Sequence, residues 1–305
     1  MNLSIATCQF PISANIRNNL KYITDQMNYA KNHGAEVVHF PEASLSGYAG
    51  TDFPSLDGYD WNLLVECTHK ILELARQYRL WVVLGSTHRL SGDHKPHNSL
   101  YIINDEGRII DRYDKMFCAG DADGKTVDLA HYTSGSHFCV FTIKDIRCGA
   151  LICHDYRYPE LYREYKKRGV QLMFHSYHAG NIPTERFHAM KSVVGDKLQP
   201  FNSGSTIPGI TMPAAMHVAA ANNYMWISCP NSSKRESCWP SFFVRPDGII
   251  IGRLRNNTAG VLISTVDTEE EYYDSTVAWR DRAMNGEYHS GVLVQDKRSE
   301  NRTEL

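Results

Sequence analysis

The chain has 305 residues, 42% of them hydrophobic, and a formal net charge of −2 at pH 7. Both signs of charge are interspersed, which argues against nucleic acid as a partner. No apolar run approaches the length of a membrane span, and the first residues lack the basic and apolar regions of a secretory signal. We therefore expect a cytoplasmic protein, away from membranes, in which the eight cysteines are reduced.

Strand-like apolar runs alternate with amphipathic helical patterns along the chain. The predicted strands are residues 3–8, 37–40, 81–85, 147–152, 170–174 and 225–228, and the clearest helices are residues 18–33, 62–78 and 159–168. Such alternation is typical of an α/β fold. Two strand–turn–strand hairpins, residues 98–110 and 242–253, lie in corresponding halves and hint at internal pseudo-symmetry. Because no Pro-, Gly- or Ser-rich linker divides the chain, residues 1–305 are predicted to form a single domain.

The first polar residue of interest follows the strand predicted at residues 37–40. Glu42 comes at its carboxyl end, with a loop through Ser46, Gly47 and Tyr48 behind it. Open α/β sheets place ligands at the carboxyl ends of their strands, and a partly buried carboxylate there can act as a general base. A solvated loop glutamate is the alternative, and spacing alone favours that alternative.

A lysine, Lys115, follows the second strand of the hairpin at residues 98–110. A lysine held against a carboxylate and a thiol stays protonated, so that it can lower the pKa of the thiol and stabilise an oxyanion. Taken alone, a lysine after a strand is more often exposed and without a catalytic role.

The most informative segment is residues 147–160, where an apolar strand ends abruptly at Cys153. A polar turn follows, and Pro159 then opens a helical pattern. A thiol at such a corner is accessible and lies near backbone N–H groups, which are the two requirements of a covalent nucleophile. Free cysteines are usually small buried hydrophobes, and Cys8 and Cys148, inside apolar runs, fit that description.

Glu42, Lys115 and Cys153, in this order and in these settings, resemble the Glu-Lys-Cys triad of the nitrilase superfamily of carbon–nitrogen hydrolases. The segments around them, residues 40–42, 113–115 and 153–160, match its three signature neighbourhoods closely. The resemblance extends from residue 5 to residue 248, and it points to the amidase or N-carbamoyl amidohydrolase branch. It implies a four-layer α-β-β-α sandwich, with two central sheets between helix layers.

The resemblance also implies a mechanism. Glu42 is expected to take the proton of Cys153, whose sulfur attacks the carbonyl or nitrile carbon. The Lys115 ammonium and the backbone N–H of His154 are expected to hold the oxyanion. Amine or ammonia leaves, and water activated by Glu42 releases the acid from a thioester, which replaces one difficult step with two easier ones. Neither a metal nor a cofactor is expected.

The chain departs from the family's pattern at several positions. Many members carry a second glutamate in a loop after the catalytic lysine, and the matching position here is Asp128, one methylene shorter. His154 stands where the family often has an aromatic residue, and Asn222 replaces the glutamate of a Glu-Asn pair. We expect Asp128 to support catalysis, and His154 and Tyr48 to contact substrate.

Two histidines follow the strand predicted at residues 170–174. We expect His175 and His178 to line the pocket mouth and to bind a polar substrate with carboxylate or hydroxyl groups, or else to serve packing. A zinc site is the alternative interpretation of this His-x-x-His pattern. However, no Cys-x-x-Cys pair accompanies it, and the strong zinc spacings are missing.

Two later segments carry expectations of their own. Residues 200–213 are rich in Gly, Pro and Ser and are predicted to be loop. The wider segment 195–216 is expected to cover the pocket or form a subunit contact, with a surface excursion as the alternative. The aromatic residues of the C-terminal extension, residues 268–305, suggest docking on a neighbouring subunit, so we expect a homodimer or a higher homo-oligomer.

Three functions remain compatible with the sequence. The first is a cysteine-dependent hydrolase that cleaves an amide or N-carbamoyl group of a small polar molecule. The second is a nitrilase, or an acyltransferase that passes the thioester to an amine. The third is a catalytically silent member that binds a metabolite or a protein partner. The intact triad argues against this interpretation, but the replacement of the family's second glutamate by Asp128 keeps it open. Amide and nitrile hydrolysis share one triad, so the sequence does not separate them.

Overall fold

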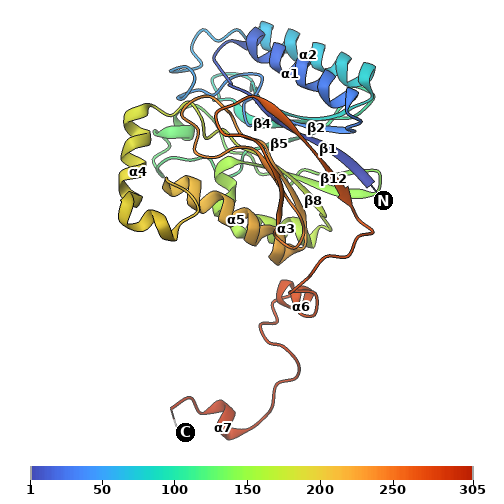
Figure 1. The fold of residues 1–305 in the computed structure, drawn as a ribbon, viewed down its shortest axis with the longest axis vertical. Coiled ribbons are helices and arrows are strands. Elements are labelled where there is room, and N and C mark those ends of the chain that lie inside the picture. Colours follow the sequence, from blue (N-terminus) through green and yellow to red (C-terminus); the bar gives the residue numbers. More distant parts are fainter. Residues whose placement is uncertain (1, 304–305) are drawn as a thin grey trace.

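The computed structural model describes residues 2–303. Two six-stranded sheets pack face to face at its centre, and helices cover the outer face of each sheet (Figure 1). The four-layer α-β-β-α sandwich predicted from the sequence is therefore confirmed. Within the described residues, no helix is both long and apolar enough to cross a membrane.

The first sheet has the strand order β12-β1-β2-β3-β4-β5. Its strands are β1 (Asn2–Gln9), β2 (Val37–His39), β3 (Trp81–His88), β4 (His97–Ile103), β5 (Ile109–Asp114) and β12 (Gly260–Asp267). The strands β1, β2 and β3 are parallel, while β4, β5 and β12 each pair antiparallel. Helices α1 (Ile16–Asn32) and α2 (Trp61–Tyr78) cover its outer face.

The second sheet has the strand order β11-β10-β9-β8-β7-β6. Its strands are β6 (Val140–Ile143), β7 (Ile146–Ile152), β8 (Leu172–Ser176), β9 (Trp226–Cys229), β10 (Phe242–Val244) and β11 (Ile250–Arg253). The parallel strands β7, β8 and β9 are again flanked by antiparallel neighbours. Both sheets thus share one strand plan, which is the pseudo-symmetry that the two hairpins hint at.

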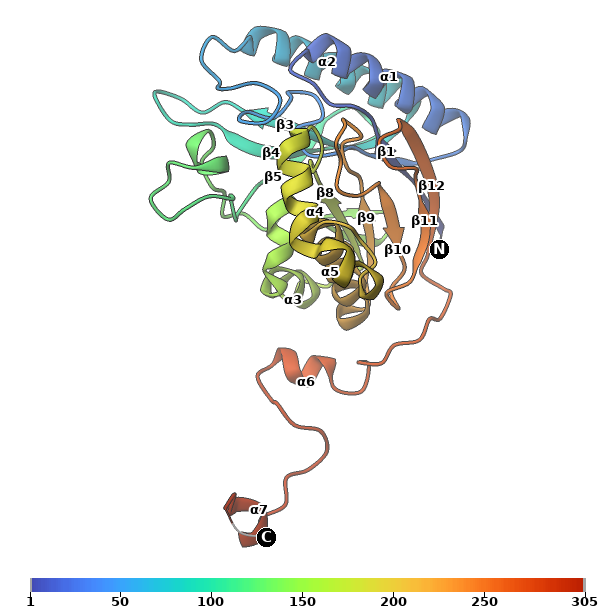
Figure 2. The same ribbon diagram turned by 60° about the vertical axis from the view of Figure 1, so that its left-hand side comes forward.

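Helices α3 (Pro159–Lys167) and α5 (Ile207–Asn223) cover the second sheet, and α4 (Thr184–Leu198) lies beside α5 (Figure 2). Three short 3₁₀ turns complete the body: η1 (Val127–Ala130), η2 (Cys153–Arg157) and η3 (Gln199–Phe201). Between the sheets, the ring of Trp81 in β3 stacks on that of Phe141 in β6, with centroids 6.4 Å apart. This packing fixes one sheet on the other and brings their strand ends together.

Local sequence explains the helices that the patterns predict. In α1, the side chain of Asn15 caps the first turn by accepting from the backbone N–H of Asn18, at 3.0 Å. The buried residues Ile23, Met27 and Ala30 recur at helical spacing on one face. Capping and periodicity are both local signals, so the sequence alone predicts this helix to within two residues.

The prediction of a loop at residues 200–213 is wrong in its second half, because the helix α5 begins at Ile207. The side chain of Thr206 accepts from the backbone N–H of Gly209 at 3.1 Å and caps the helix. Pro208 lies in the first turn, where a missing N–H costs nothing. Pro213 lies further along, but the helix runs on through it because apolar residues such as Met216 pack against the sheet. Tertiary packing overrides the composition of this segment.

The C-terminal extension leaves the body as a tail that carries α6 (Arg280–Met284) and α7 (Lys297–Glu300) (Figures 1 and 2). Its root is anchored, since Tyr272 packs edge-on against Trp226 with ring centroids 5.3 Å apart. Beyond the root, apolar side chains face solvent: Tyr288 is 87% exposed and Val292 is 91% exposed.

Candidate active site

The nucleophile candidate lies where β7 ends. Cys153 is the first residue of the turn η2, and its backbone has a positive φ of 41°. A non-glycine residue in this left-handed region is strained, and such strain concentrates at functional sites. The sharp turn directs the chain away from the sheet, so that Cys153 stays partly exposed while Cys8 and Cys148 are fully buried.

A buried carboxylate, Asp155, holds this turn in place. Its Oδ2 accepts from the backbone N–H of Ile152 at 2.9 Å and from the hydroxyl of Tyr113 at 2.8 Å. Its Oδ1 accepts from the backbone N–H of Phe117 at 2.9 Å. Burial raises the pKa of Asp155 to about 6. Sequence reasoning missed this residue, although an acidic side chain two positions after the nucleophile, in a polar turn, is a recognisable capping signal.

Lys115 lies between two carboxylates. Its Nζ is 2.9 Å from Oε1 of Glu42 and 2.7 Å from Oδ2 of Asp128. All three side chains are at most 2% exposed. Glu42 follows β2 and Lys115 follows β5, which run in the same direction, so their carboxyl ends lie at one edge of the sheet.

Asp128 comes from the loop between β5 and β6 and reaches Lys115 from the other side. Its Oδ2 also accepts from the backbone N–H of Ala119 at 2.9 Å, and its Oδ1 accepts from the hydroxyl of Tyr48. That hydroxyl in turn accepts from Lys115 at 3.4 Å. The structure therefore places both Asp128 and Tyr48 in direct contact with Lys115.

The two carboxylate oxygens of Glu42 differ in their hydrogen bonding. Oε1 accepts from Lys115 and from Nδ2 of Asn98, at 2.8 Å. Within residues 2–303, Oε2 has no hydrogen-bond partner, although it is buried. A buried carboxylate oxygen without a donor is a strong proton acceptor. Sequence reasoning did not single out Asn98, which lies inside a strand and carries no motif.

The charges of this cluster act on one another. Burial disfavours the ammonium of Lys115, but Asp128 and Glu42 outweigh it and hold the pKa of Lys115 well above its usual value. Burial likewise opposes the charge of Asp128, yet Lys115 keeps the pKa of that carboxyl below its usual range. The lysine is therefore a permanent cation and Asp128 a permanent anion at neutral pH.

The thiol behaves differently. Burial, followed by the charge of Glu42, raises the pKa of Cys153 well above its usual value, although Lys115 and the backbone N–H of His178 act in the opposite direction. The resting sulfur is thus a neutral thiol, and it needs a base when it attacks. The charges of both Glu42 and Lys115 therefore act on this thiol.

The structure places His175 beneath the nucleophile rather than at a pocket mouth. Its ring lies between the hydroxyl of Tyr162, 2.7 Å from Nδ1, and the carbonyl oxygen of Cys153, 3.3 Å from Nε2. Burial lowers its pKa to about 3, so the imidazole is neutral. Alternate residues of a strand face opposite sides, which directs His175 toward the helix layer.

His178 and His154 are the other two histidines predicted to contact substrate. Nε2 of His178 is 3.0 Å from Oδ2 of Asp52, and both side chains are almost fully buried. His154 follows the nucleophile and is partly exposed, with its ring edge-on to Tyr158. Burial and the charge of Lys115 lower the pKa of His154. Among residues 2–303, no group of three His, Cys, Asp or Glu side chains is arranged to hold a metal ion.

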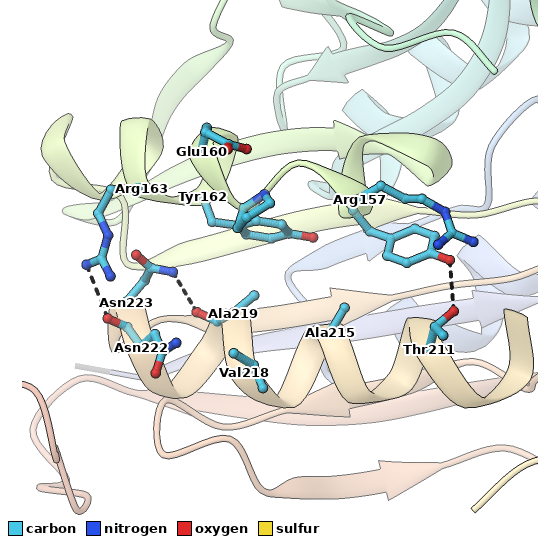
Figure 3. A pocket seen from close by; sticks show the side chains of 12 residues that line it. Arg157, Glu160, Tyr162, Arg163, Thr211, Ala215, Val218, Ala219, Asn222 and Asn223 are labelled. Atoms are coloured by element: carbon cyan, nitrogen blue, oxygen red, sulfur yellow. Dashed lines mark hydrogen bonds between the residues drawn. The ribbon is translucent and has the colours of Figure 1, made fainter. Parts of the chain in front are cut away.

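A pocket of about 590 Å³ lies between α3 and α5 (Figure 3). Its lining includes Tyr156 and Arg157 of the nucleophile turn, Thr211 and Ala215 of α5, and Asn223 at the end of that helix. Its lining residues come from η2, α3 and α5, so the pocket lies on the helix side of the second sheet. None of the triad side chains lines it, and the pocket is therefore distinct from the candidate active site.

Comparison with known proteins places this arrangement in a family. The carbon-nitrogen hydrolase family model matches residues 4–272. The chain is 27% identical to a human omega-amidase over 172 residues, which are 55% of this chain and 61% of that protein. It is 26% identical to a deaminated glutathione amidase of Yersinia enterocolitica over 183 residues, 56% of this chain and 61% of that protein. The chain thus spans about three-fifths of the length of these relatives.

Solved structures agree on the fold. A Nesterenkonia amidase from the nitrilase superfamily superposes with a TM-score of 0.67 at 19% identity, covering 88% of this chain and 91% of that one. A glutamine-dependent NAD+ synthetase of Acinetobacter baumannii gives a TM-score of 0.65 at 18% identity, covering 88% of this chain and 46% of that one. Since the family model matches residues 4–272, which are most of the chain, the protein belongs to the carbon-nitrogen hydrolase family.

Proposed function

We propose that the protein is a cysteine-dependent amidase that hydrolyses an amide or N-carbamoyl group of a small polar molecule. The observation that carries this proposal is the buried Glu42–Lys115–Asp128 cluster, whose charges act on the thiol of Cys153 at the end of β7. Amide substrates are favoured over nitriles because the relatives named above are amidases. The reduced thiol that this chemistry needs suits the cytoplasm.

The first half of the reaction forms a thioester. Oε2 of Glu42 takes the thiol proton as the sulfur of Cys153 attacks the carbonyl carbon. The ammonium of Lys115 and the backbone N–H of His154 hold the oxyanion, and each donor contributes about 2.7–4 kcal/mol to the transition state by analogy with other enzymes. When the tetrahedral intermediate collapses, the carbon–nitrogen bond breaks and Glu42 returns the proton to the departing nitrogen.

The second half releases the acid. Glu42, again a carboxylate, takes a proton from water as that water attacks the thioester carbon. The carbon–sulfur bond then breaks, and the sulfur recovers the proton from Glu42. Asp128 and Tyr48 act on this reaction through Lys115, because the ammonium of Lys115 donates to both of them. We assign His154, partly exposed beside the nucleophile, to contacts with polar groups of the substrate, whereas the side chain of His178 is 0% exposed and paired with Asp52.

The test is intact-protein mass spectrometry during incubation with a panel of small amides, carbamoyl amino acids and nitriles. Wild type is compared with Cys153→Ala, which lacks the nucleophile, and with Glu42→Gln, which lacks the base of both half-reactions and should slow both. An added mass equal to the acyl group, absent in Cys153→Ala, is expected with an amide or carbamoyl substrate. Turnover of nitriles alone, or of any substrate by Cys153→Ala, would overturn the proposal, and transfer to an added amine would identify an acyltransferase.

We also propose that the tail, residues 268–303, docks on a second copy of the chain. Its apolar side chains Val292 and Tyr288 have no cover within the described residues, and the α3–α5 pocket offers an apolar wall that includes Val218, 56% exposed. The root of the tail lies at the end of the same pocket, since the hydroxyl of Thr276 donates to the carbonyl oxygen of Asn222 at 3.5 Å.

Light scattering on size-exclusion fractions tests this assembly. The full chain is expected to be a dimer or larger, while a chain ending at residue 285 and the Val218→Asp variant should both shift toward monomer. A full chain that is monomeric at micromolar concentration, or a truncated chain that keeps the assembly unchanged, contradicts the proposal.

A further inference from the structure

A short segment after β8 runs between the nucleophile and the loop that carries Glu42. The carbonyl oxygen of Tyr177 accepts from the backbone N–H of Glu42 at 3.2 Å. The next residue, His178, lies alongside Cys153, because β7 and β8 pair in parallel with Ile152 opposite Ser176. The backbone N–H of His178 lowers the pKa of the Cys153 thiol. Two successive residues therefore act on the base and the nucleophile through their backbone.

The carboxylate of Asp52 anchors the segment. Its Oδ2 lies 3.0 Å from Nε2 of His178 and accepts from the backbone N–H of Tyr48, also at 3.0 Å. Its Oδ1 accepts from Nδ2 of Asn181 at 3.0 Å. The loop behind Glu42 and the segment after β8 are separated by more than 120 residues, and this carboxylate joins them.

The pair of His178 and Asp52 is buried in the wall of the site. The side chains of His178 and Asp52 are 0% and 1% exposed, so removing either partner leaves the other buried and unpaired. The ring of His178 also packs against that of Tyr48, with centroids 5.2 Å apart, and Tyr48 contacts Lys115 and Asp128. The pair is thus built into the wall of the site.

We propose that Asp52 and His178 are positioning residues, whose buried side-chain pair holds the backbone N–H of His178 against the sulfur of Cys153. The inference rests on the proposed role of Cys153 as the nucleophile. An N–H directed at sulfur stabilises the thiolate more than the thiol. It therefore eases the loss of the thiol proton to Glu42 in a site where burial opposes that loss.

The pair should respond to pH in a defined direction. Burial disfavours the imidazolium of His178, but the charge of Asp52, its hydrogen bond and the charge of Glu42 together raise the pKa of His178. Tyr48, the other titratable group packed on the ring, stays neutral because burial raises its pKa. The ionic contribution of the pair is therefore complete below the pKa of an unfolded histidine, about 6.5. It is lost as the pH rises through the raised pKa.

The test follows the thiol directly and needs no substrate. The rate at which iodoacetamide alkylates Cys153 is measured against pH by peptide mass spectrometry, which separates this cysteine from the other seven. Wild type is compared with Asp52→Asn, His178→Ala and His178→Gln. Asp247→Asn is the matched control, because Asp247 is also paired, with Arg245 at 2.6 Å, but lies in the β10–β11 turn at the opposite edge of the sheet.

Asp52→Asn and His178→Ala are expected to raise the apparent pKa of Cys153 by about one unit, which slows alkylation about tenfold at a pH below it. His178→Gln can keep a hydrogen bond to Asp52 without titrating, so it should recover part of the rate and lose the alkaline dependence. Asn181→Ala, which removes one contact of Asp52, should give a smaller slowing in a chain that still folds. If the first two variants alkylate like Asp247→Asn at every pH, the inference is overturned.

The outcome is separable from that of the proposed function. If wild type hydrolyses no member of the amide panel but the alkylation rates shift as stated, the hydrolase assignment fails and the positioning role of the pair stands. If amides are hydrolysed and the alkylation rates do not shift, the positioning role alone fails.

Discussion

Replacing Lys115 with methionine removes the cation that lies between Glu42 and Asp128 and leaves two buried carboxylates facing each other. At the observed distances of 2.9 and 2.7 Å, each attraction is about 6 kcal/mol at an effective dielectric constant of about 20. Most of that gain offsets the cost of burying the charges. The expected net loss is therefore that of breaking a buried ion pair, about 3–5 kcal/mol in the free energy of unfolding.

Thermal unfolding at neutral pH measures this loss, which should lower Tm by at least about 6 °C. Lys70→Met is the matched control, because Lys70 pairs with Glu66 at 3.0 Å on the surface, with both side chains about half exposed. Exposed pairs contribute little to stability, so the control should unfold close to wild type. Activity should be lost in Lys115→Met and kept in the control.

A double variant sharpens the test. Adding Asp128→Asn to Lys115→Met removes one of the two uncompensated charges, so the double variant should unfold at a higher temperature than Lys115→Met while staying inactive. The reasoning is refuted if Lys115→Met unfolds like Lys70→Met, or if the double variant is no more stable than the single one.

Two further predictions concern carboxylates of the site. Asp128→Glu adds a methylene to a buried, fully engaged side chain, so it should change kcat and cost about 1–3 kcal/mol of stability without unfolding the protein; unchanged kinetics would mean that Asp128 does not support Lys115. Because burial raises the pKa of Asp155 to about 6, above the pKa of an unfolded carboxyl, the unfolded state loses this proton first as pH rises. From pH 4 to 7, wild type should therefore lose roughly 2 kcal/mol of stability relative to Asp155→Asn, as measured by urea unfolding; parallel pH curves would contradict the raised pKa.

Much of this architecture follows from local patterns. The strand runs, the caps and the amphipathic faces of α1 and α2 are properties of short stretches, so their periodicity predicts them before any tertiary contact is known. That Glu42, Lys115 and Cys153 each follow a strand at its carboxyl end was also predictable from the sequence. Glu42 and Lys115 follow strands of the first sheet, however, and Cys153 follows β7 of the second, so only the packing of one sheet on the other brings the thiol to the two charged residues.

The contacts that only the tertiary structure decides are made by residues in loops or join segments that are far apart in the sequence. Asp128 reaches Lys115 from a loop whose path no periodicity describes, and Asp52 meets His178 across 126 residues of sequence. His175 faces the helix layer because strand alternation is fixed by which face is buried, and α5 forms through Pro213 because packing on the sheet outweighs one lost hydrogen bond. A sequence states which side chains are present, whereas long-range packing decides which of them meet.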